Sequence, residues 1–329
     1  MKRRVFAAAL AATTSMILAG LAVAPAHAAP PGGPALDVPA PRLSAALSCG
    51  PFVHPERDTV LLVHGTGLNA EQSWRWNYEQ TLPGAGFDVC AVTMPSHAMG
   101  DIQVSSEYVV AAVRTIANRT HRKVSIIGHS QGGLEPRWAI RWWPDVRARV
   151  SRYIGLGSPN HGLTFADLCA ASGNCWPAVW QFAHGSKFLA ALNSGGETPG
   201  PTAYTAMYSL TDELVQPAAP AATGALSPAA NSSTIAVQDI CPGRPVNHIS
   251  LMDDAVVWAV VMQALHSAHP ASARLISRAV CAQSTMPGLT PVDAAAGNAS
   301  TYVAAIQGFN AEPGIHAEPP LKPYAANTR

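Results

Sequence analysis

The segment Gly128-His129-Ser130-Gln131-Gly132 has the strongest chemical signature in the sequence. The pattern G-x-S-x-G places a serine on a sharp turn between a strand and a helix, where a Cβ on either flanking residue would clash. The same turn presents backbone N–H groups at a helix N-terminus, where they can stabilise an oxyanion. An incidental Gly/Ser turn is the alternative, but an apolar run precedes the motif and a helical pattern follows it. We therefore predict that Ser130 is a nucleophile.

A serine at its ordinary pKa is a weak nucleophile and needs a general base with an orienting acid. In this kind of site the chain order is serine, acid, histidine. His248 fits best, because it follows a short turn after a late apolar strand, where a loop-borne base is expected. The other histidines after the serine lie too early in the chain, near a helix end or in a proline-rich tail: His161, His184, His266, His269 and His316.

Asp212 is the best candidate for the orienting acid. It directly follows a predicted strand over residues 204–210. The carboxyl ends of strands in an open α/β sheet share one edge, so this carboxylate is expected on the same side as the serine. Glu213, which is adjacent, is the second choice. Asp239 also follows a strand but lies only nine positions before His248. Asp253 and Asp254 are expected at a helix N-terminus instead.

The loop His64-Gly65-Thr66-Gly67, after an apolar run over residues 59–63, supplies a further group for this chemistry. Thr66 can donate both its backbone N–H and its hydroxyl to an oxyanion, and the backbone N–H of Gln131 is the second donor. Losing one such donor costs about 3–4 kcal/mol of transition-state stabilisation.

The elements that must position these residues form an α/β pattern. Apolar runs alternate with helical patterns, which predicts an α/β-hydrolase-type fold with a mostly parallel central sheet and helices on both faces. The predicted strands cover residues 59–63, 87–92, 123–127, 152–156, 204–210 and 234–239. The predicted helices cover residues 74–82, 105–118, 134–143, 253–267, 271–280 and 291–308.

No repeat or linker divides the chain after its first 28 residues, so residues 29–329 are predicted to be a single domain. Residues 163–200 break the alternation and are expected to form a small lid or cap region. Residues 29–48 are rich in Pro and Ala and are expected to be extended, as is the C-terminal tail from about residue 311.

Composition excludes several classes of protein. Of the 329 residues, 48% are hydrophobic and only 12% are charged, which excludes a coiled coil, an acidic disordered region and a basic nucleic-acid-binding domain. Residues 29–329 carry 18 basic and 20 acidic side chains, a net charge of −2. We therefore expect no nucleic acid or other anionic polymer as a partner.

Residues 1–28 have the pattern of a secretory signal peptide. Lys2-Arg3-Arg4 precedes an apolar stretch over residues 5–23, and Ala26-His27-Ala28 is a small-x-small cleavage signature. An N-terminal membrane anchor is the alternative, but the stretch contains Thr and Ser and is followed by Pro25. The mature protein is expected to be secreted after cleavage near Ala28.

Six cysteines in an exported chain favour disulfides, although the sequence alone leaves their pairing open. No C-x-x-C or Cys/His cluster indicates a zinc site. Gly65-x-Gly67-x-x-Ala70 imitates a dinucleotide fingerprint with Asp88 downstream. However, Asp88 precedes its strand instead of ending it, and an exported protein is a poor place for NAD. No metal or cofactor is therefore expected.

Four stretches of the chain resemble the Candida antarctica lipase B-like lipases of the α/β-hydrolase superfamily, over roughly residues 45–310. They are Leu62-Val-His-Gly-Thr-Gly67, Ser130-Gln-Gly-Gly-Leu134, Ser209-Leu-Thr-Asp-Glu-Leu-Val-Gln-Pro217 and Val246-Asn-His248. The third is far more specific than G-x-S-x-G. The resemblance implies a triad and two oxyanion donors at the residues chosen above: Ser130, Asp212 and His248, with Thr66 and Gln131.

The resemblance also implies two disulfides, Cys49–Cys90 and Cys241–Cys281, which leave Cys169–Cys175 as a local third pair. The chain departs from the family's type enzyme, which lacks the glycine corresponding to Gly128 and has a C-terminal bridge that is missing here. The segment Ser158-Pro-Asn-His-Gly162 instead resembles many bacterial lipases. The lids and acyl-pocket walls of the family correspond to residues 163–200 and 285–310. The substrate range is therefore the property that can least be inferred for this chain from the family.

The sequence thus predicts a secreted serine ester hydrolase, a lipase acting on acylglycerols as a monomer with transient contact to a lipid interface. An esterase or polyester hydrolase, an acyltransferase and, more distantly, a non-catalytic binding module are the alternatives. Five apolar residues are expected to line or cover an acyl pocket, with ordinary core or lid packing as the other interpretation: Leu163, Phe165, Trp176, Trp180 and Phe182.

Overall fold

A central sheet of seven strands organises the computed structural model, which describes residues 32–219 and 222–326. The predicted signal peptide, residues 1–28, lies outside the described residues. The strand order is β1-β3-β2-β4-β5-β6-β7; β1 pairs antiparallel with β3, and all other neighbours are parallel. The strands are β1 (Leu47–Cys49), β2 (Thr59–Val63), β3 (Val89–Val92), β4 (Val124–His129), β5 (Val150–Leu156), β6 (Ala203–Tyr208) and β7 (Ser232–Ala236).

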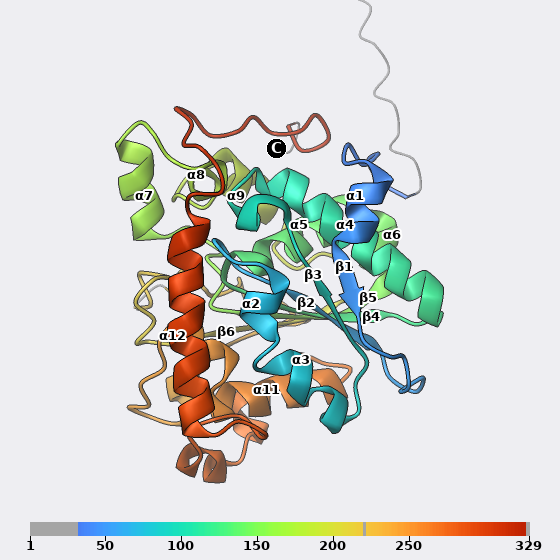
Figure 1. Cartoon of the computed structure of the whole chain (residues 1–329), viewed down its shortest axis with the longest axis vertical. Helices are drawn as coiled ribbons and strands as arrows, with labels where there is room; N and C mark the ends of the chain where they lie inside the picture. The colour runs from blue at the N-terminus through green and yellow to red at the C-terminus, as the bar shows by residue number, and fades with distance from the viewer. Residues whose placement is uncertain (1–31, 220–221, 327–329) are drawn as a thin grey trace, which may run out of the picture.

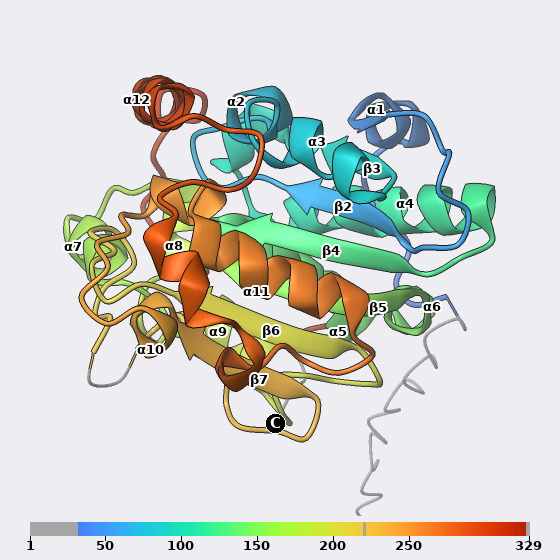
Figure 2. The same cartoon turned by 90° about the horizontal axis from the view of Figure 1, so that it is seen from below.

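Helices cover both faces of this sheet (Figures 1 and 2). They are α1 (Ala40–Ala45), α2 (Ala70–Trp74), α3 (Tyr78–Thr81), α4 (Ile102–Thr120), α5 (Leu134–Trp142), α6 (Pro144–Arg149), α7 (Thr164–Ala171), α8 (Pro177–Gln181), α9 (Lys187–Asn193), α10 (Val237–Ile240), α11 (Ala255–His266) and α12 (Pro291–Gly308). The α4, α5 and α6 helices lie on one face, and α2, α3 and α11 lie on the other. This arrangement confirms the predicted α/β-hydrolase fold class.

The two faces of the sheet bury separate cores, which explains the continuous apolar runs of the central strands. Along β2, Leu61 and Val63 belong to the core beneath α4 and α5. Val60 and Leu62, which point the other way, belong to the core beneath α2 and α11. Because both faces are buried, alternation between polar and apolar residues is absent from these strands.

The predicted helix over residues 74–82 is wrong, because the structure divides it into α2 and α3. Asn77 causes the break. Its side-chain amide donates to the carbonyl of Ser73, and its Oδ1 accepts the N–H of Tyr78. An Asn side chain that bonds the backbone in this way competes with helical hydrogen bonds and caps the next helix instead.

The predicted helix over residues 271–280 is also wrong. Two short 3₁₀ turns, Ala273–Leu275 and Arg278–Ala282, stand in its place. Only Ala271 is buried in this stretch, and its other apolar residues are exposed or pack only partly buried against the core, so too little apolar surface is covered to hold a longer helix.

Smaller differences concern element ends. Residues 40–45, expected to be extended, form α1, which begins beside Pro41. The β6 strand ends at Tyr208, and the strand expected over 234–239 ends at Ala236 and leads into α10. Among the described residues, no helix combines the length and apolar character needed to cross a membrane.

Candidate active site

Ser130 lies on a tight turn between β4 and α5, at the carboxyl edge of the sheet. Its φ is +56°, which is unusual for a residue with a Cβ. A Cβ at Gly128 would lie 2.1 Å from the carbonyl oxygen of Gly132, and a Cβ at Gly132 would lie 2.3 Å from that of Val63. Glycine at both flanking positions is therefore required by backbone contacts, as the motif predicts.

The structure brings Asp212 and His248 together from loops that follow β6 and α10. His248 Nδ1 lies 2.8 Å from Asp212 Oδ2, and both side chains are buried. Asp212 Oδ1 accepts the backbone N–H groups of Leu214 and Val215, each at 2.9 Å. These bonds fix the carboxylate, which in turn fixes the imidazole.

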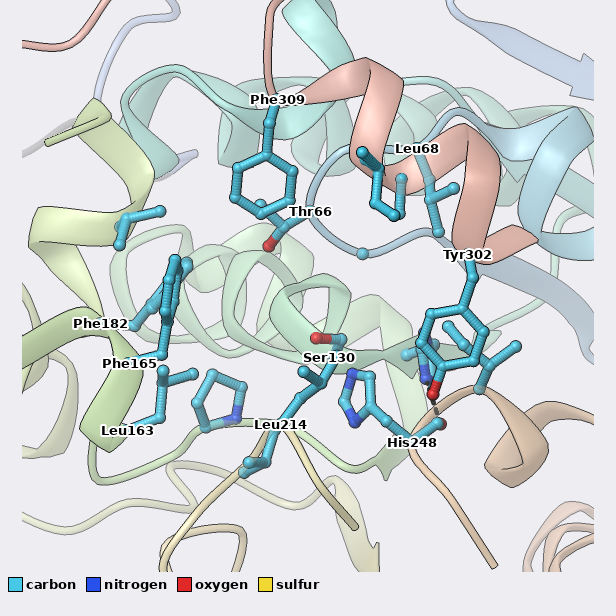
Figure 3. Close-up of a pocket in the computed structure, with 18 residues that line it drawn as sticks. Thr66, Leu68, Ser130, Leu163, Phe165, Phe182, Leu214, His248, Tyr302 and Phe309 are labelled. Atoms are coloured by element: carbon cyan, nitrogen blue, oxygen red, sulfur yellow. Dashed lines mark hydrogen bonds between the residues drawn. The ribbon is translucent and has the colours of Figure 1, made fainter. Parts of the chain in front are cut away.

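Electrostatics favour the ion pair of the two side chains. Burial lowers the pKa of His248, but the charge and hydrogen bond of Asp212 outweigh burial and raise it above its ordinary value. Burial raises the pKa of Asp212, but His248 outweighs burial and lowers it. When neutral, His248 donates from Nδ1 to the carboxylate, which leaves Nε2 as the basic nitrogen. Ser130 and His248 both line one cavity, where they are neighbours (Figure 3).

Thr66 lies in the loop after β2, on the opposite side of Ser130 from His248 (Figure 3). Its hydroxyl donates to Oε1 of Gln131 at 2.6 Å. The adjacent Gly67 has a φ of +75° and donates its N–H to the carbonyl of His97 at 2.7 Å. The two residues predicted as oxyanion donors are therefore neighbours in the structure.

Two buried histidines beside this loop were not singled out by sequence reasoning. His64 Nε2 accepts the N–H of Met94 at 2.9 Å, so Nδ1 carries the hydrogen and donates to the carbonyl of Gly65. Burial lowers the pKa of His64 to about 4. His129 donates from Nε2 to the carbonyl of His248 at 3.0 Å, and burial lowers its pKa to about 3. Both rings are neutral and hold backbone groups in place through hydrogen bonds. In the sequence, only their positions beside the two motifs indicated this role.

The other acids and histidines weighed in the sequence lie in different surroundings. Glu213 accepts the N–H of His248 at 3.0 Å and the hydroxyl of Tyr302 from α12. Asp239 bonds the N–H of Ala236 at the start of α10, and Asp254 caps α11, as a helix N-terminus predicts. The remaining histidines pair with local acids or occupy element ends: His161 with Glu197, His184 with Asp167, His266 at the end of α11, and His269 and His316 in loops.

A cavity of about 350 Å³ opens beside Ser130, with walls that are almost entirely apolar. Leu163, Phe165 and Phe182 line it, as predicted. Trp176 and Trp180 do not: Trp176 packs edge-on against Phe309, and Trp180 donates to the carbonyl of Ile315 in the C-terminal tail. Trp176 thus supports the cavity wall through Phe309, and both tryptophans pack partly buried against the core.

The α12 helix supplies a cavity wall that the sequence located only as a region (Figure 3). Four of its residues or immediate successors face the cavity: Tyr302, Ala305, Ile306 and Phe309. The helix packs directly against the Thr66 loop: a Cβ added at Gly67 would lie only 2.6 Å from the carbonyl oxygen of Ala305. Leu214 and Val215, which follow Asp212, complete the opposite wall.

Three disulfides are present: Cys49–Cys90, Cys169–Cys175 and Cys241–Cys281. The first joins β1 to β3. The third holds the turn before His248 against the segment that follows α11. In the part of the chain that the structure describes, no three His, Cys, Asp or Glu side chains gather as a metal-binding group.

A mostly parallel sheet with a strand–serine–helix turn at its carboxyl edge defines the class of α/β-hydrolases. Residues 57–240 match the model of the family described as Lipase (class 2), and the chain belongs to that family. It is 29% identical to lipase B of Pseudozyma antarctica over 297 residues, which cover 89% of this chain and 86% of that protein. The crystal structure of Aspergillus fumigatus lipase B superposes with a TM-score of 0.84 at 28% identity, over 90% of this chain and 74% of that one.

These relatives confirm the resemblance to lipase B-like enzymes. The protein is a lipase-family hydrolase of carboxylic esters.

Proposed function

We propose that the protein is a secreted lipase that hydrolyses acylglycerol esters through an acyl-enzyme formed on Ser130. The observation that carries this proposal is the buried Asp212–His248 pair beside a serine that opens onto an apolar cavity. An apolar cavity of about 350 Å³ suits a hydrocarbon acyl chain.

In the first half of the reaction, Ser130 Oγ attacks the ester carbonyl carbon while His248 Nε2 takes the hydroxyl proton. The oxygen of the tetrahedral intermediate accepts hydrogen bonds from Thr66 and from the N–H of Gln131. The ester C–O bond then breaks, and His248 gives its proton to the leaving alcohol. Asp212 stabilises the imidazolium throughout.

In the second half, His248 takes a proton from water, which attacks the acyl carbon. The bond to Ser130 Oγ breaks, the carboxylic acid leaves, and the serine recovers its proton. An alcohol that reaches the acyl-enzyme before water gives a new ester instead, so the same intermediate supports acyl transfer.

The mouth of the cavity is suited to a lipid surface. Phe165 of α7, Leu214 and Ile306 of α12 are large apolar side chains that line the cavity and are also exposed to solvent. We propose that a monomer contacts the interface through this rim, and that residues 163–200 form the lid and pocket wall. Secretion is supported by the signal-peptide pattern of residues 1–28 and by three disulfides.

The test is the release of p-nitrophenol from esters ranging from acetate to palmitate, with wild type beside Ser130→Ala. The proposal predicts activity in the wild type that is lost in the variant, with preference for medium or long acyl chains and a rise in rate when substrate forms an emulsion. Activity confined to the shortest esters would make the protein an esterase. A folded, oxidised wild type without activity on any of them would contradict the proposal.

A further inference from the structure

Glu135, in the first turn of α5, is a fully buried carboxyl group that the proposed mechanism does not use. Its Oε1 accepts a hydrogen bond from the side-chain amide of Gln131 at 2.7 Å. Its Oε2 has no hydrogen-bond partner among the described residues. A buried carboxyl group with one partner is unfavourable for stability, so its presence directly behind the Ser130 turn calls for a physical reason.

The Gln131 amide links this carboxyl group to Thr66. Gln131 Nε2 also donates to the carbonyl of Ala98 at 2.9 Å, so both of its hydrogens point to oxygen acceptors. That orientation turns Oε1 toward Thr66, whose hydroxyl donates to it at 2.6 Å. A continuous chain of hydrogen bonds therefore runs from Glu135 through Gln131 to the Thr66 hydroxyl.

The segment on the far side of the Gln131 amide has a strained backbone. Ser96, His97 and Ala98 have φ values of 48°, 52° and 59°. Ala98 holds the Gln131 amide, and His97 accepts the N–H of Gly67. Strained residues persist where the surrounding contacts determine them, and they cluster at functional sites. Here the carbonyl groups of Ala98 and His97 hold the Gln131 side chain and the Thr66 loop in fixed positions relative to each other.

We propose that Glu135 is a positioning residue for the oxyanion donors: it holds the Gln131 amide, which places the Thr66 hydroxyl, and only its neutral form lets that hydroxyl turn to the oxyanion. The inference rests on the proposed function, because it requires Thr66 to be an oxyanion donor.

With neutral Glu135, Oε1 of Gln131 is an ordinary amide acceptor, and a charged oxyanion competes successfully for the Thr66 hydrogen. An ionised Glu135 would polarise the amide, because hydrogen bonds in a chain strengthen one another, and Oε1 would hold that hydrogen more firmly. The added negative charge would also disfavour the oxyanion directly. Both effects slow the reaction when Glu135 loses its proton.

The protonation state of Glu135 agrees with this role. Burial raises the pKa of Glu135 to about 8, against the opposing hydrogen bond from Gln131. The group is therefore neutral at pH 7 and ionises in mildly alkaline solution, so the rate should fall as pH rises through that range.

The charged groups on neighbouring elements are engaged elsewhere. Tyr153 of β5, whose pKa is raised by burial and by Glu135, stays neutral over the same range. On α4, Arg114 pairs with Asp145 of α6, and Glu107 accepts a backbone N–H. Arg137 of α5 itself bonds Asn160.

The first experiment is a double-mutant cycle between Glu135→Leu and Thr66→Val, measured as kcat and KM on a soluble short-chain p-nitrophenyl ester. Thr66→Val should lower kcat by about a hundredfold, as expected for the loss of one oxyanion donor. Glu135→Leu should lower kcat by about tenfold in the wild-type background, with KM unchanged. In a protein that already carries Thr66→Val, it should cause no further loss of kcat.

An equal Glu135→Leu loss in both backgrounds would overturn the inference, because the effect would then bypass the Thr66 hydroxyl. Thr66→Val without any loss would overturn the oxyanion assignment itself, and the inference with it. If the single variant Glu135→Leu kept full activity while the single variant Thr66→Val lost activity, the inference would be overturned, but the oxyanion assignment would stand.

The second experiment uses Glu135→Gln, which keeps a neutral acceptor of the same shape and guards against a leucine variant that fails to fold. This variant should keep wild-type kcat at pH 7. In a pH-stat assay, the wild-type rate should decline above about pH 8, whereas Glu135→Gln should show no such decline. The same alkaline decline in both proteins would contradict a role for Glu135 ionisation.

Discussion

The two sides of Ser130 are built in different ways. On the oxyanion side, Thr66 and Gln131 follow the central strands β2 and β4, and a Cβ added to the glycines there would clash with backbone oxygen atoms. On the acid–base side, Asp212 and His248 come from loops after β6 and α10. Their side chains bond each other, backbone N–H groups hold the Asp212 carboxylate, and Glu213 holds the N–H of His248. The first side is determined by close backbone packing at glycines that recognisable motifs mark in the sequence. The second depends on hydrogen bonds between residues 35 and 36 positions apart, which lie in separate loops.

The largest effect should come from the acid–base side. His248→Ala removes the general base, and kcat should fall by about 10⁶-fold, because the triad acts as a unit. The matched control is His269→Ala, an exposed histidine in the loop after α11, which should leave the rate unchanged. Ester hydrolysis by the purified proteins measures both. Similar rates for wild type and His248→Ala would remove this histidine from the site.

Asp212→Asn tests the ion pair through the pH profile. It should lower kcat by about 10⁴-fold. Burial lowers the pKa of His248, and the charge of Asp212 raises it above the ordinary value. The wild-type rate rises with pH as His248 loses its proton. Without the carboxylate charge, burial remains and the pKa falls, so the acid limb of kcat/KM should move to lower pH. An unshifted limb would show that another group titrates.

Gly65→Ala tests the oxyanion side through sterics alone. Its Cβ would lie 2.9 Å from Ser130 Cβ and 3.1 Å from the carbonyl oxygen of His129, so the Thr66 loop must shift. We expect kcat to fall by about a hundredfold with KM little changed. Gly84→Ala is the control, because nothing lies within 4 Å of its added Cβ. A loss shared by both variants would indicate general destabilisation.

The smallest expected effect on activity comes from a comparison of two disulfides that close loops of similar length. Cys49–Cys90 and Cys241–Cys281 close loops of 41 and 40 residues. Replacing either pair by alanine should lower the free energy of unfolding by about 4 kcal/mol, as measured by chemical denaturation. Only loss of Cys241–Cys281 should also lower kcat, by a few-fold, because that bridge anchors the turn before His248. Equal kcat losses would contradict the division into two sides.

The same division explains what the sequence could predict. The Ser130 turn and the Thr66 loop were predictable because glycines directly after apolar strands mark places where the backbone packs too closely for a Cβ. The partnership of Asp212 with His248 followed from their positions after predicted strands, from chain order and from a family resemblance. The α12 helix was predicted as a helix, but its bond from Tyr302 to Glu213 joins residues 89 positions apart, which no periodicity reports.

The errors have the same origin. Residues 271–280 have a helical pattern but are mostly exposed or only partly buried against the core, and Asn77 breaks a predicted helix through its side chain. For Trp176 and Trp180, the sequence left open a place at the cavity or ordinary packing, and the structure shows packing against the core. Their positions depend on Phe309 and on the C-terminal tail, which lie more than a hundred residues away along the chain.

The central claim is that Ser130 is the activated nucleophile of this site. The most direct measurement is reaction of the oxidised protein with a fluorophosphonate, followed by mass spectrometry of its peptides. The account predicts a single adduct on Ser130, absent from Ser130→Ala and formed far more slowly in His248→Ala. An adduct on another residue, or none on a folded wild type, would contradict it.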